Sequence, residues 1–457
     1  MRKARTASME TERAILTTIR QAVTLRTAAA LTRAVADLIS TGGIPAQARL
    51  PTIRAVSDSL GMSRSAVGQA WRQLQTQGLV ESKRRGGTTV IAQPTPPHAK
   101  RFESMIRASI DMPTDLGNLW CGDMPPINLG GAFEYAVAQP GVGHQFAHQI
   151  TPELKQAVSA SWPFHTDSFL AMHGAVDALE MSLAALVRPG DRVAVAVPTI
   201  ARVFDILESL SATPVPIPWQ GAGPDLEDLR RALVGRPAAF VYQPSRALPN
   251  GKSVTPEWVT TAAEVLAGTI PILEMDQTWP LQGTPNSLGT KLPDQVLHTR
   301  SFNYVFGADM RMAVVGGNSR LTDVLWNRLS YSSRYVSRIM QLAHAYLLTD
   351  PDTLTMLKSW NAEIHRRHEA FADALRRRGH ESELGSPPMI WLPVPDEHSV
   401  CTRLSNQGIV VHPGAFFQPG THWDQRISIN AAAFSSGFEN LAEEIAVACD
   451  PRLGGGA

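Results

Sequence analysis

Basic, hydroxyl and amide side chains gather in the first fifth of the chain, and their chemistry suits a polyanion. Residues 1–93 hold 14 Lys and Arg against 5 Asp and Glu, a net charge of +9, whereas the remainder holds 28 against 36, a net charge of −8. Arginine and lysine attract phosphates whatever the base sequence, and arginine also bonds base edges. We therefore predict a nucleic-acid surface made of Arg49, Thr52, Arg54, Ser63, Arg64, Ser65, Gln69, Arg72, Lys83, Arg84 and Arg85.

Few other residues have the spacing that a disulfide framework, a metal site or a catalytic site requires. The three cysteines lie far apart with no C-x-x-C spacing, which excludes a disulfide framework or a cysteine metal site and favours a reducing cytoplasm. The pairs His144/His148 and His365/His368 have helical spacing that could bind a metal. We interpret the second pair as solvated surface and expect no metal site. The sequence contains no Ser-His-Asp arrangement, no P-loop and no dinucleotide fingerprint in the right context.

Local signals predict the elements that position the basic residues. Apolar residues at helical spacing, with Thr52 and Ser63 as N-caps, predict three helices, and two short strands flank the basic tip at 83–87. Two helices joined by a turn at Gly61 and followed by a hairpin are the elements of a winged helix-turn-helix, whose second helix enters the major groove. We expect residues 1–25 to be a poorly ordered extension that leads into a helix.

The rest of the chain predicts an α/β body. Short apolar strands alternate with segments long enough for crossover helices, which is typical of a mostly parallel sheet. A helical stretch at 321–348 precedes an α+β part that starts at Asp350, and no apolar run reaches the ~18 residues of a membrane span. The expected strands are 193–197, 238–242, 270–274 and 312–315. The expected domains are the extension 1–25, the winged helix 26–93, a Pro-rich linker 94–114 and the body 115–457.

One segment carries a specific resemblance. Residues 50–90, LPTIRAVSDSLGMSRSAVGQAWRQLQTQGLVESKRRGGTTV, resemble the GntR-type DNA-binding domain at almost every framework position of its pattern. The resemblance implies that Arg54, Arg64 and the wing glycine Gly87 lie at the DNA. Gly68 in the recognition helix departs from the pattern; it costs about 1 kcal/mol of helix propensity, and we expect it to let the backbone approach DNA closely.

The body resembles fold-type I aminotransferases, as found fused to GntR heads in the MocR subfamily. Six landmarks occur in the family's order, at 172–179, 242–251, 274–276, 301–311, 408–417 and 426–429. The resemblance implies that Asp276 would meet the pyridine nitrogen of pyridoxal phosphate, Arg311 its phosphate and Arg426 a substrate carboxylate. The implied pocket, a degenerate cofactor site, comprises Gly174, Ala175, Ile200, Asn250, Asp276, Ser301, Tyr304, Arg311 and Arg426.

Tyr304 stands where the resemblance places the cofactor lysine. A pyridoxal-phosphate enzyme needs a lysine amine to form a Schiff base, and a phenol cannot form one. Lys291, the nearest lysine, lies thirteen residues upstream in a different loop. We interpret Tyr304 as a packed or hydrogen-bonded phenol and expect no covalent cofactor and no catalysis.

The resemblance implies a cytoplasmic transcription regulator of the bacterial type. Its winged helix would bind double-stranded operator DNA, and its body would form a homodimer, often head-to-tail, and sense a small effector. Three alternatives stay open. The pocket could hold pyridoxal phosphate noncovalently through Arg311, Asp276 and the Gly174 turn. The body could be a working aminotransferase with a vestigial head, or a pure dimerisation scaffold.

Overall fold

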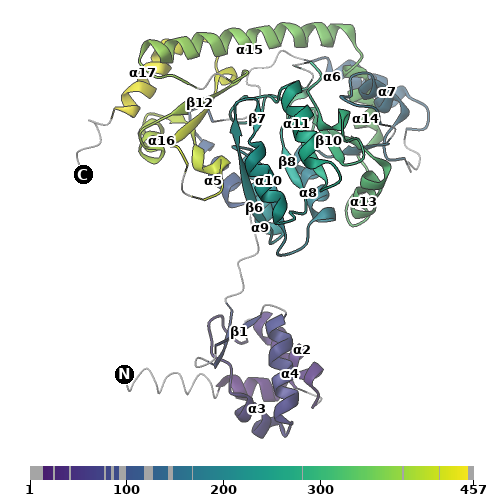
Figure 1. Cartoon of the computed structure of the whole chain (residues 1–457), viewed down its shortest axis with the longest axis vertical. Helices are drawn as coiled ribbons and strands as arrows, with labels where there is room; N and C mark the ends of the chain where they lie inside the picture. Colours follow the sequence, from purple (N-terminus) through teal and green to yellow (C-terminus); the bar gives the residue numbers. More distant parts are fainter. Residues whose placement is uncertain are drawn as a thin grey trace. The chain divides into compact units, whose positions relative to one another are not determined.

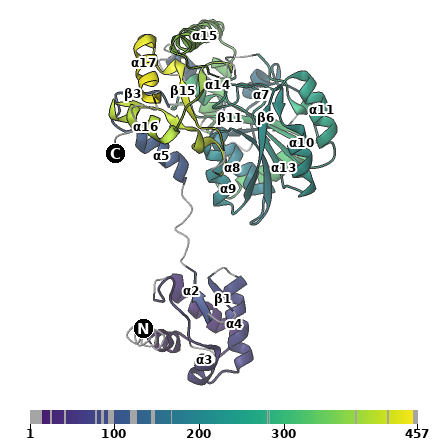
Figure 2. The same cartoon turned by 60° about the vertical axis from the view of Figure 1, so that its left-hand side comes forward.

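The chain folds into two compact units, Met1–His98 and Ala99–Ala457, called unit 1 and unit 2 below (Figures 1 and 2). The structure is a computed structural model. It describes residues 14–23, 26–40, 43–76, 79–83, 87–91, 99–117, 127–142, 148–166, 168–279, 281, 283–382, 385–420 and 423–450.

Unit 1 is a winged helix-turn-helix, as predicted. The Thr52 hydroxyl accepts a hydrogen bond from the backbone three residues on, and Gly61 ends the same helix in the left-handed conformation, with φ 63°. The Ser63 hydroxyl caps the next helix in the same way. These caps set the tight turn between the two helices. The elements are α2 (Ala28–Ser40), α3 (Ile53–Leu60), α4 (Arg64–Thr76) and an antiparallel hairpin of β1 (Val80–Lys83) and β2 (Gly87–Val90).

The N-terminal extension needs a correction. Residues 14–22 are helical rather than a poorly ordered tail. Ile15 and Ile19, which are 4% and 0% exposed, belong to the same apolar cluster as residues of α2 and α4. Side chains four residues apart lie on one face of a helix, so both isoleucines are buried together against the winged helix.

The predicted linker at 94–114 also needs a correction. Residues from Ala99 onward belong to unit 2, and α5 (Lys100–Ser109) and β3 (Thr114–Asp115) lie inside the range assigned to the linker. Met105 of α5 is buried in a small apolar cluster of unit 2, and β3 pairs with a strand near the C-terminus. A short helix with one buried apolar residue leaves little periodic signal, so its sequence reads as linker.

Unit 2 is built on an eight-stranded sheet in the order β4-β11-β10-β9-β8-β5-β6-β7. The strands from β10 to β6 are mutually parallel, whereas β11 runs antiparallel to both of its neighbours and β7 antiparallel to β6. The mostly parallel sheet is therefore confirmed, and the four expected strands correspond to β5, β8, β9 and β11. The bounds are β4 (Ser168–Met172), β5 (Arg192–Val197), β6 (Thr213–Gln220), β7 (Gly223–Pro224), β8 (Phe240–Tyr242), β9 (Ile272–Asp276), β10 (Val296–Ser301) and β11 (Ala313–Gly317).

Helices cover both faces of this sheet (Figure 1). Along β5, the side chains of Val193, Val195 and Val197 enter one apolar cluster with α8, α9 and α13, and the alternate alanines enter another with α6, α7, α10, α11 and α14. The stretch expected as one helix at 321–348 is two helices, α13 and α14. The bounds are α6 (Leu129–Ala138), α7 (Pro152–Ser159), α8 (Ala175–Leu186), α9 (Ala201–Ser209), α10 (Leu226–Val234), α11 (Pro256–Leu266), α12 (Asn303–Phe306), α13 (Ser319–Leu329) and α14 (Arg338–Leu347).

The C-terminal part is α+β, as expected from Asp350 onward. A three-stranded antiparallel sheet in the order β12-β15-β14 packs with its helices around a separate apolar cluster. None of the helices in the described ranges is long and apolar enough to cross a membrane. The bounds are α15 (Pro351–Arg377), β12 (Met389–Pro393), α16 (Glu397–Asn406), β13 (Ile409–Val410), β14 (His412–Pro413), β15 (Arg426–Asn430) and α17 (Phe438–Cys449); short 3-10 turns occupy Leu288–Thr290, Gly414–Phe417 and Ala431–Ala433.

Candidate functional site

The second helix of the helix-turn-helix exposes the polar side chains that the sequence singled out. Arg64, Ser65, Gln69 and Arg72 are exposed along α4. Val67, Ala70, Trp71 and Leu74 on its opposite side are buried. This separation places hydrogen-bonding side chains on the outer face of α4, as entry into a DNA groove requires.

The other predicted DNA residues fall into three groups. The hydroxyls of Thr52 and Ser63 act as helix caps, and Arg54 is exposed with an ion pair of 3.7 Å to Asp58. Arg49 lies against the base of the wing, because a Cβ built on Gly87 would lie 2.7 Å from the Arg49 Nε. Arg84, Arg85 and the side chain of Lys83 lie outside the described residues.

Gly68, expected to let the backbone approach DNA closely, lies in the middle of α4. Its α-carbon is buried, and a Cβ built there would meet Arg72 Nη1 and Ile53 Cδ1 of α3, each at 3.8 Å. The glycine therefore lies between the exposed Arg72 side chain and Ile53 of α3, with room for a Cβ.

In unit 2 a cavity of about 650 Å³ lies at the carboxyl ends of the sheet strands. Its walls come from segments that follow β4, β5, β9 and β10, from α5, and from β14. Ligands of open α/β sheets bind at this edge, because the loops after parallel strands converge there. The cavity is therefore the candidate ligand site of unit 2.

Six of the nine residues predicted for this pocket line the cavity. They are Gly174, Ala175, Ile200, Ser301, Tyr304 and Arg311. Asn250 is 1% exposed in a loop, where its Oδ1 accepts from the Lys252 backbone. Arg426 begins β15, and its guanidinium lies 3.6 Å from Asp424. Asp276, the third residue that does not line the cavity, is fully buried.

Sequence reasoning missed several cavity residues. Phe102 and Met105 were missed because α5 was assigned to the linker. Arg202 lies on α9, one turn before Asp205, and had no family landmark to mark it. His412 lies inside the landmark at 408–417 and was not singled out. The lining residues in this group are Phe102, Met105, Ile106, Arg202 and His412, and the cavity is also lined by His173, Gln277 and Asn303, which lie within or beside the landmarks.

The cavity brings cationic and neutral nitrogen groups together. Burial lowers the pKa of Arg202. The negative charge of Asp205 opposes this effect, and the like charge of Arg311 adds to it. Burial lowers the pKa of His412 to about 4, so its imidazole is neutral. His412 is 3% exposed, and its Nδ1 has no hydrogen-bond partner among the described residues. These groups offer hydrogen-bond donors and positive charge to a ligand.

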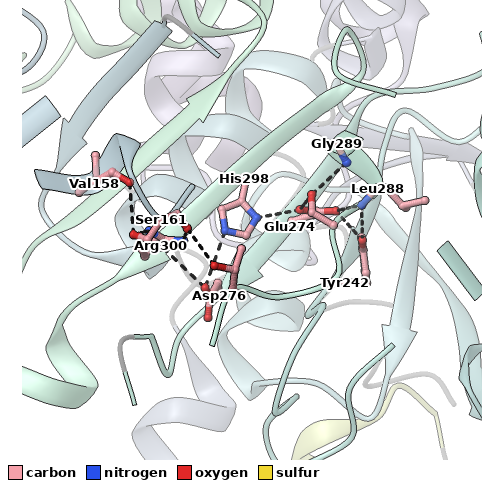
Figure 3. Close-up of polar contacts among 11 residues, drawn as sticks. Val158, Ser161, Tyr242, Glu274, Asp276, Leu288, Gly289, His298 and Arg300 are labelled. Atoms are coloured by element: carbon pink, nitrogen blue, oxygen red, sulfur yellow. Dashed lines mark hydrogen bonds and ion pairs between the residues drawn. The ribbon is translucent and has the colours of Figure 1, made fainter. Parts of the chain in front are cut away.

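Asp276 belongs to a buried ionic network, formed where β9 and β10 pair in parallel (Figure 3). Glu274 is opposite His298 in the register, and Asp276 is opposite Arg300. The Asp276 Oδ2 lies 3.8 Å from His298 Nε2 and 3.8 Å from Arg300 Nε. Asp276 is thus flanked by two basic side chains of the neighbouring strand.

The partners of this network hold each side chain in place. Glu274 accepts hydrogen bonds from the Tyr242 hydroxyl at 2.5 Å and the Ser287 hydroxyl at 2.6 Å, and lies 2.7 Å from His298 Nδ1. Burial alone lowers the pKa of His298, but Asp276 and Glu274 together raise it above its ordinary value. Burial raises the pKa of Tyr242 well above its ordinary value, and Glu274 adds to the effect.

Arg300 is enclosed by aromatic rings. Its guanidinium carbon lies 4.8 Å and 4.1 Å from the ring centroids of Trp162 and Trp279, and it donates to the Ser161 hydroxyl and carbonyl. Burial lowers the pKa of Arg300 to about 10, so it remains charged at neutral pH beside Asp276.

The second histidine pair is not solvated surface, contrary to our interpretation. His368 of α15 is 5% exposed, and its Nε2 lies 3.3 Å from the Met389 carbonyl oxygen. The Nε2 of His365 lies 3.3 Å from Arg246 Nη2. The long helix α15 turns these residues toward its packed side. His144 lies outside the described residues, within which no group of three or more His, Cys, Asp and Glu could hold a metal ion.

Comparisons with known proteins agree with both units. Residues 27–90 match the family described as bacterial regulatory proteins, gntR family. The chain is 28% identical over 392 residues to the vitamin B6 salvage pathway transcriptional repressor PtsJ of Salmonella typhimurium, spanning 83% of this chain and 88% of that one. It is 23% identical over 425 residues to the HTH-type transcriptional regulator YdcR of Escherichia coli, spanning 84% and 90%.

Solved structures confirm the fold of unit 2. An aspartate aminotransferase from Thermus thermophilus with maleate superposes with a TM-score of 0.67 at 20% identity, covering 77% of this chain and 94% of that one. A kynurenine aminotransferase from Pyrococcus horikoshii gives 0.67 at 15% identity, covering 76% and 94%. The predicted fold class, a GntR-like winged helix followed by an aminotransferase fold, is confirmed.

The cavity residues do not fit a covalently held pyridoxal phosphate, the cofactor of aminotransferases. That group needs a lysine amine, and among the described residues that line the cavity there is no lysine. Tyr304, 6% exposed in α12, lines it instead. Asp276, the residue expected at the pyridine nitrogen, faces His298 and Arg300.

Proposed function

We propose that this protein is a DNA-binding transcription regulator whose unit 2 senses a small molecule and does not catalyse transamination. The observation that carries the proposal is the cavity of unit 2, which lies at the ligand edge of an aminotransferase fold and is lined by Tyr304 without a lysine. The same chain carries a winged helix with an exposed polar face on α4. A binding site without the reactive amine supports recognition rather than covalent chemistry.

The absence of a covalent cofactor can be tested by mass. The protein is incubated with pyridoxal phosphate, reduced with borohydride and weighed. We expect no phosphopyridoxyl adduct on a lysine of unit 2, because the described residues that line the cavity include the phenol of Tyr304 and no lysine. The variant Tyr304→Lys is the matched positive control and should acquire the adduct. An adduct on a unit 2 lysine of the unmodified chain would refute the proposal.

Noncovalent binding of pyridoxal phosphate is the second candidate, considered because the chain is similar to a repressor named for vitamin B6 salvage. Equilibrium dialysis of the unreduced protein distinguishes a site that binds pyridoxal phosphate noncovalently from one that does not bind it. Cofactor that binds at equilibrium and is removed by later exhaustive dialysis would identify pyridoxal phosphate as the effector. If no cofactor binds at equilibrium, the ligand is a different small molecule.

DNA binding should involve the exposed face of α4. We expect Arg64→Ala to weaken operator binding by about 1–3 kcal/mol, because an arginine at this position reaches base edges or phosphates. Arg320→Ala, which removes an exposed arginine of unit 2, is the control and should leave affinity unchanged. Footprinting at several stated salt concentrations measures both effects. Equal affinities for the two variants would contradict the assignment of α4.

The assembly that we propose is a homodimer formed mainly by unit 2, in the cytoplasm. Two-fold symmetry of such a dimer predicts paired operator half-sites spaced by helical turns, in palindromic or direct-repeat order. Light scattering of the full chain with and without operator DNA measures the stoichiometry, and a monomer that binds a single half-site would contradict this part of the proposal.

A further inference from the structure

Helix α5 is held on unit 2 by a cap that comes from another helix. Its own N-cap residue, Ala99, makes no side-chain hydrogen bond. The backbone N–H groups of Arg101 and Phe102 instead donate to the two carboxylate oxygens of Asp205, at 3.2 Å and 3.1 Å. Asp205 lies on α9 and is 6% exposed. A carboxylate at the start of a helix satisfies free N–H groups and complements the helix dipole.

The remaining contacts of α5 are mostly electrostatic. The Arg202 guanidinium lies 4.1 Å from the centroid of the Phe102 ring, and that of Arg101 lies 5.0 Å from the Phe204 ring. Lys100 forms an ion pair of 3.2 Å with Glu208, in which both side chains are half exposed or more. Met105 is the buried residue of α5. A helix with one buried apolar residue docks weakly and can be released at low free-energy cost.

Arg202 contacts α5 and the cavity at the same time. Both Arg202 and Phe102 line the cavity, and Arg311 lines it as well. The two arginines are close enough for the charge of Arg311 to lower the pKa of Arg202. The Arg202 Nε is buried and has no hydrogen-bond partner among the described residues. Two like charges that share a cavity attract an anion that can lie between them.

The other walls of the cavity contribute histidines, three carboxylates and an apolar surface. His412 adds a buried Nδ1 that no described residue contacts by a hydrogen bond. The three carboxylates are those of Asp115, Asp177 and Glu180. Asp177 accepts from the His173 backbone at 3.1 Å, and Asp115 accepts from the Gly117 backbone at 3.0 Å, so these two side chains are held by hydrogen bonds within the chain. The apolar part of a ligand would meet Ile200, Leu248 and Met105.

We propose that Arg202 and α5 form a latch, in which the phosphate or carboxylate of a small ligand takes the Arg202 guanidinium away from the Phe102 ring and releases α5. A cation–π contact weakens when the cation is neutralised by a bound anion. The proposal rests on the sensing role proposed above and specifies the ligand class and the residue that detects it. α5 is the first described helix after the segment that joins unit 2 to unit 1. Its release therefore frees the part of unit 2 to which that segment is attached.

Hydrogen exchange of the full chain tests the latch without DNA. The probes are inorganic phosphate, maleate and pyridoxine 5′-phosphate, with uncharged pyridoxine as the matched neutral compound and sodium chloride at equal ionic strength as the salt control. None of these probes carries an aldehyde, so Schiff-base chemistry does not enter. We expect the amides of 99–110 to exchange about fivefold faster with an anionic probe, which corresponds to about 1 kcal/mol.

The three anionic probes distinguish the source of the negative charge. A response to phosphate or its ester alone identifies a phosphorylated ligand, and a response to maleate alone identifies a carboxylate ligand. Exchange of 99–110 that stays unchanged or slows with every anionic probe would overturn the proposal. A response to pyridoxine or to sodium chloride as large as that to the anions would also overturn it.

Two variants separate the latch from a general loss of structure. Arg202→Met keeps the apolar stem, and we expect it to abolish the response to anions while the rest of unit 2 exchanges as before. Asp205→Asn weakens the cap and should raise the exchange of 99–110 about fivefold without any ligand, while anion binding persists. Arg320→Met is the control and should behave like the unmodified chain. An Arg202→Met protein that still responds to anions would refute the role of Arg202, whatever the outcome of the DNA and borohydride tests.

Discussion

At the scale of residues, Asp276 shows how a buried carboxylate is held by charges on the neighbouring strand. Two carboxylates on β9, Glu274 and Asp276, are opposite two basic side chains on β10, His298 and Arg300, in a fully buried register. A buried charge is tolerated when it is paired, and this network pairs all four. Asp276 therefore has partners within the chain and needs no charged ligand nitrogen to balance it.

His298 makes the stability of unit 2 depend on pH. Its pKa is raised in the folded protein, so the stabilisation by the charged imidazole is complete below the ordinary histidine pKa and is lost as pH rises through the raised pKa. We expect His298→Gln to lower the free energy of unfolding by about 3 kcal/mol at about pH 6, and by less at about pH 9. Denaturant unfolding at both pH values measures the difference.

Comparing the unmodified protein with His298→Gln isolates the contribution of His298 to the pH dependence of stability. Burial lowers the pKa of His344 and of His412 to about 4. The folded state resists protonation of these two histidines, so it loses stability as pH falls. Both are present in the two proteins compared, and their effects cancel. A loss of stability that is equal at the two pH values, or larger at the alkaline one, would show that His298 is neutral in the folded protein.

At the scale of elements, two glycines of the helix-turn-helix have opposite roles. Gly68 lies in the middle of α4 with its nearest possible Cβ contacts at 3.8 Å, which is ordinary van der Waals distance. We expect Gly68→Ala to stabilise unit 1 by about 1 kcal/mol through helix propensity and to leave DNA affinity unchanged. Chemical unfolding and an operator-binding assay measure the two quantities.

Gly61 is the matched comparison for this prediction. It has φ 63°, and a Cβ there would lie 3.1 Å from Arg26 Nη1. Gly61→Ala should destabilise unit 1 by about 1 kcal/mol, because an alanine is strained in the left-handed conformation. If Gly68→Ala weakened DNA binding without changing stability, close approach of the backbone to DNA would be the correct explanation after all.

The helix at 14–22 gives a second prediction at this scale. Ile19 is fully buried in the core of unit 1, whereas Arg20 beside it is exposed. Ile19→Ala should destabilise unit 1 by about 2–4 kcal/mol, because it leaves a cavity in that core. Arg20→Ala should change the stability by less than about 0.5 kcal/mol. Similar effects of the two substitutions would place the helix outside the core.

At the scale of the whole molecule, the two units have separate apolar cores. The cluster of unit 1 contains residues up to Val90, and the described clusters of unit 2 begin at Met105. Units that share no core can unfold independently, because cooperativity follows contiguous packing. The chain therefore has two structural parts whose stabilities can be altered one at a time.

This independence predicts two calorimetric transitions for the full chain. Gly68→Ala should shift the transition of unit 1 upward by about 4–8 °C and leave the other in place. His298→Gln should lower the transition of unit 2 alone. A single transition that both substitutions move would show that the units unfold together.

The sequence by itself determined the parts of this protein that depend on local order. The caps at Thr52 and Ser63, the turn at Gly61 and the alternation of strands and helices are readable, because each depends on residues close together in the chain. Six cavity residues were named from the resemblance to aminotransferases, and the structure places them along one cavity.

Tertiary structure alone decided the features that join distant segments. α5 was assigned to the linker because it leaves little periodic signal, and its cap, Asp205, lies about a hundred residues away, on α9. Asp276 was assigned to the pocket from the resemblance to aminotransferases. The two basic side chains that flank it lie on β10, and only strand pairing brings them together. A helix cap or a charge partner that comes from a distant segment leaves no periodic pattern in the sequence. The side chains around α5 and in the buried ionic network could therefore be identified only in the folded structure.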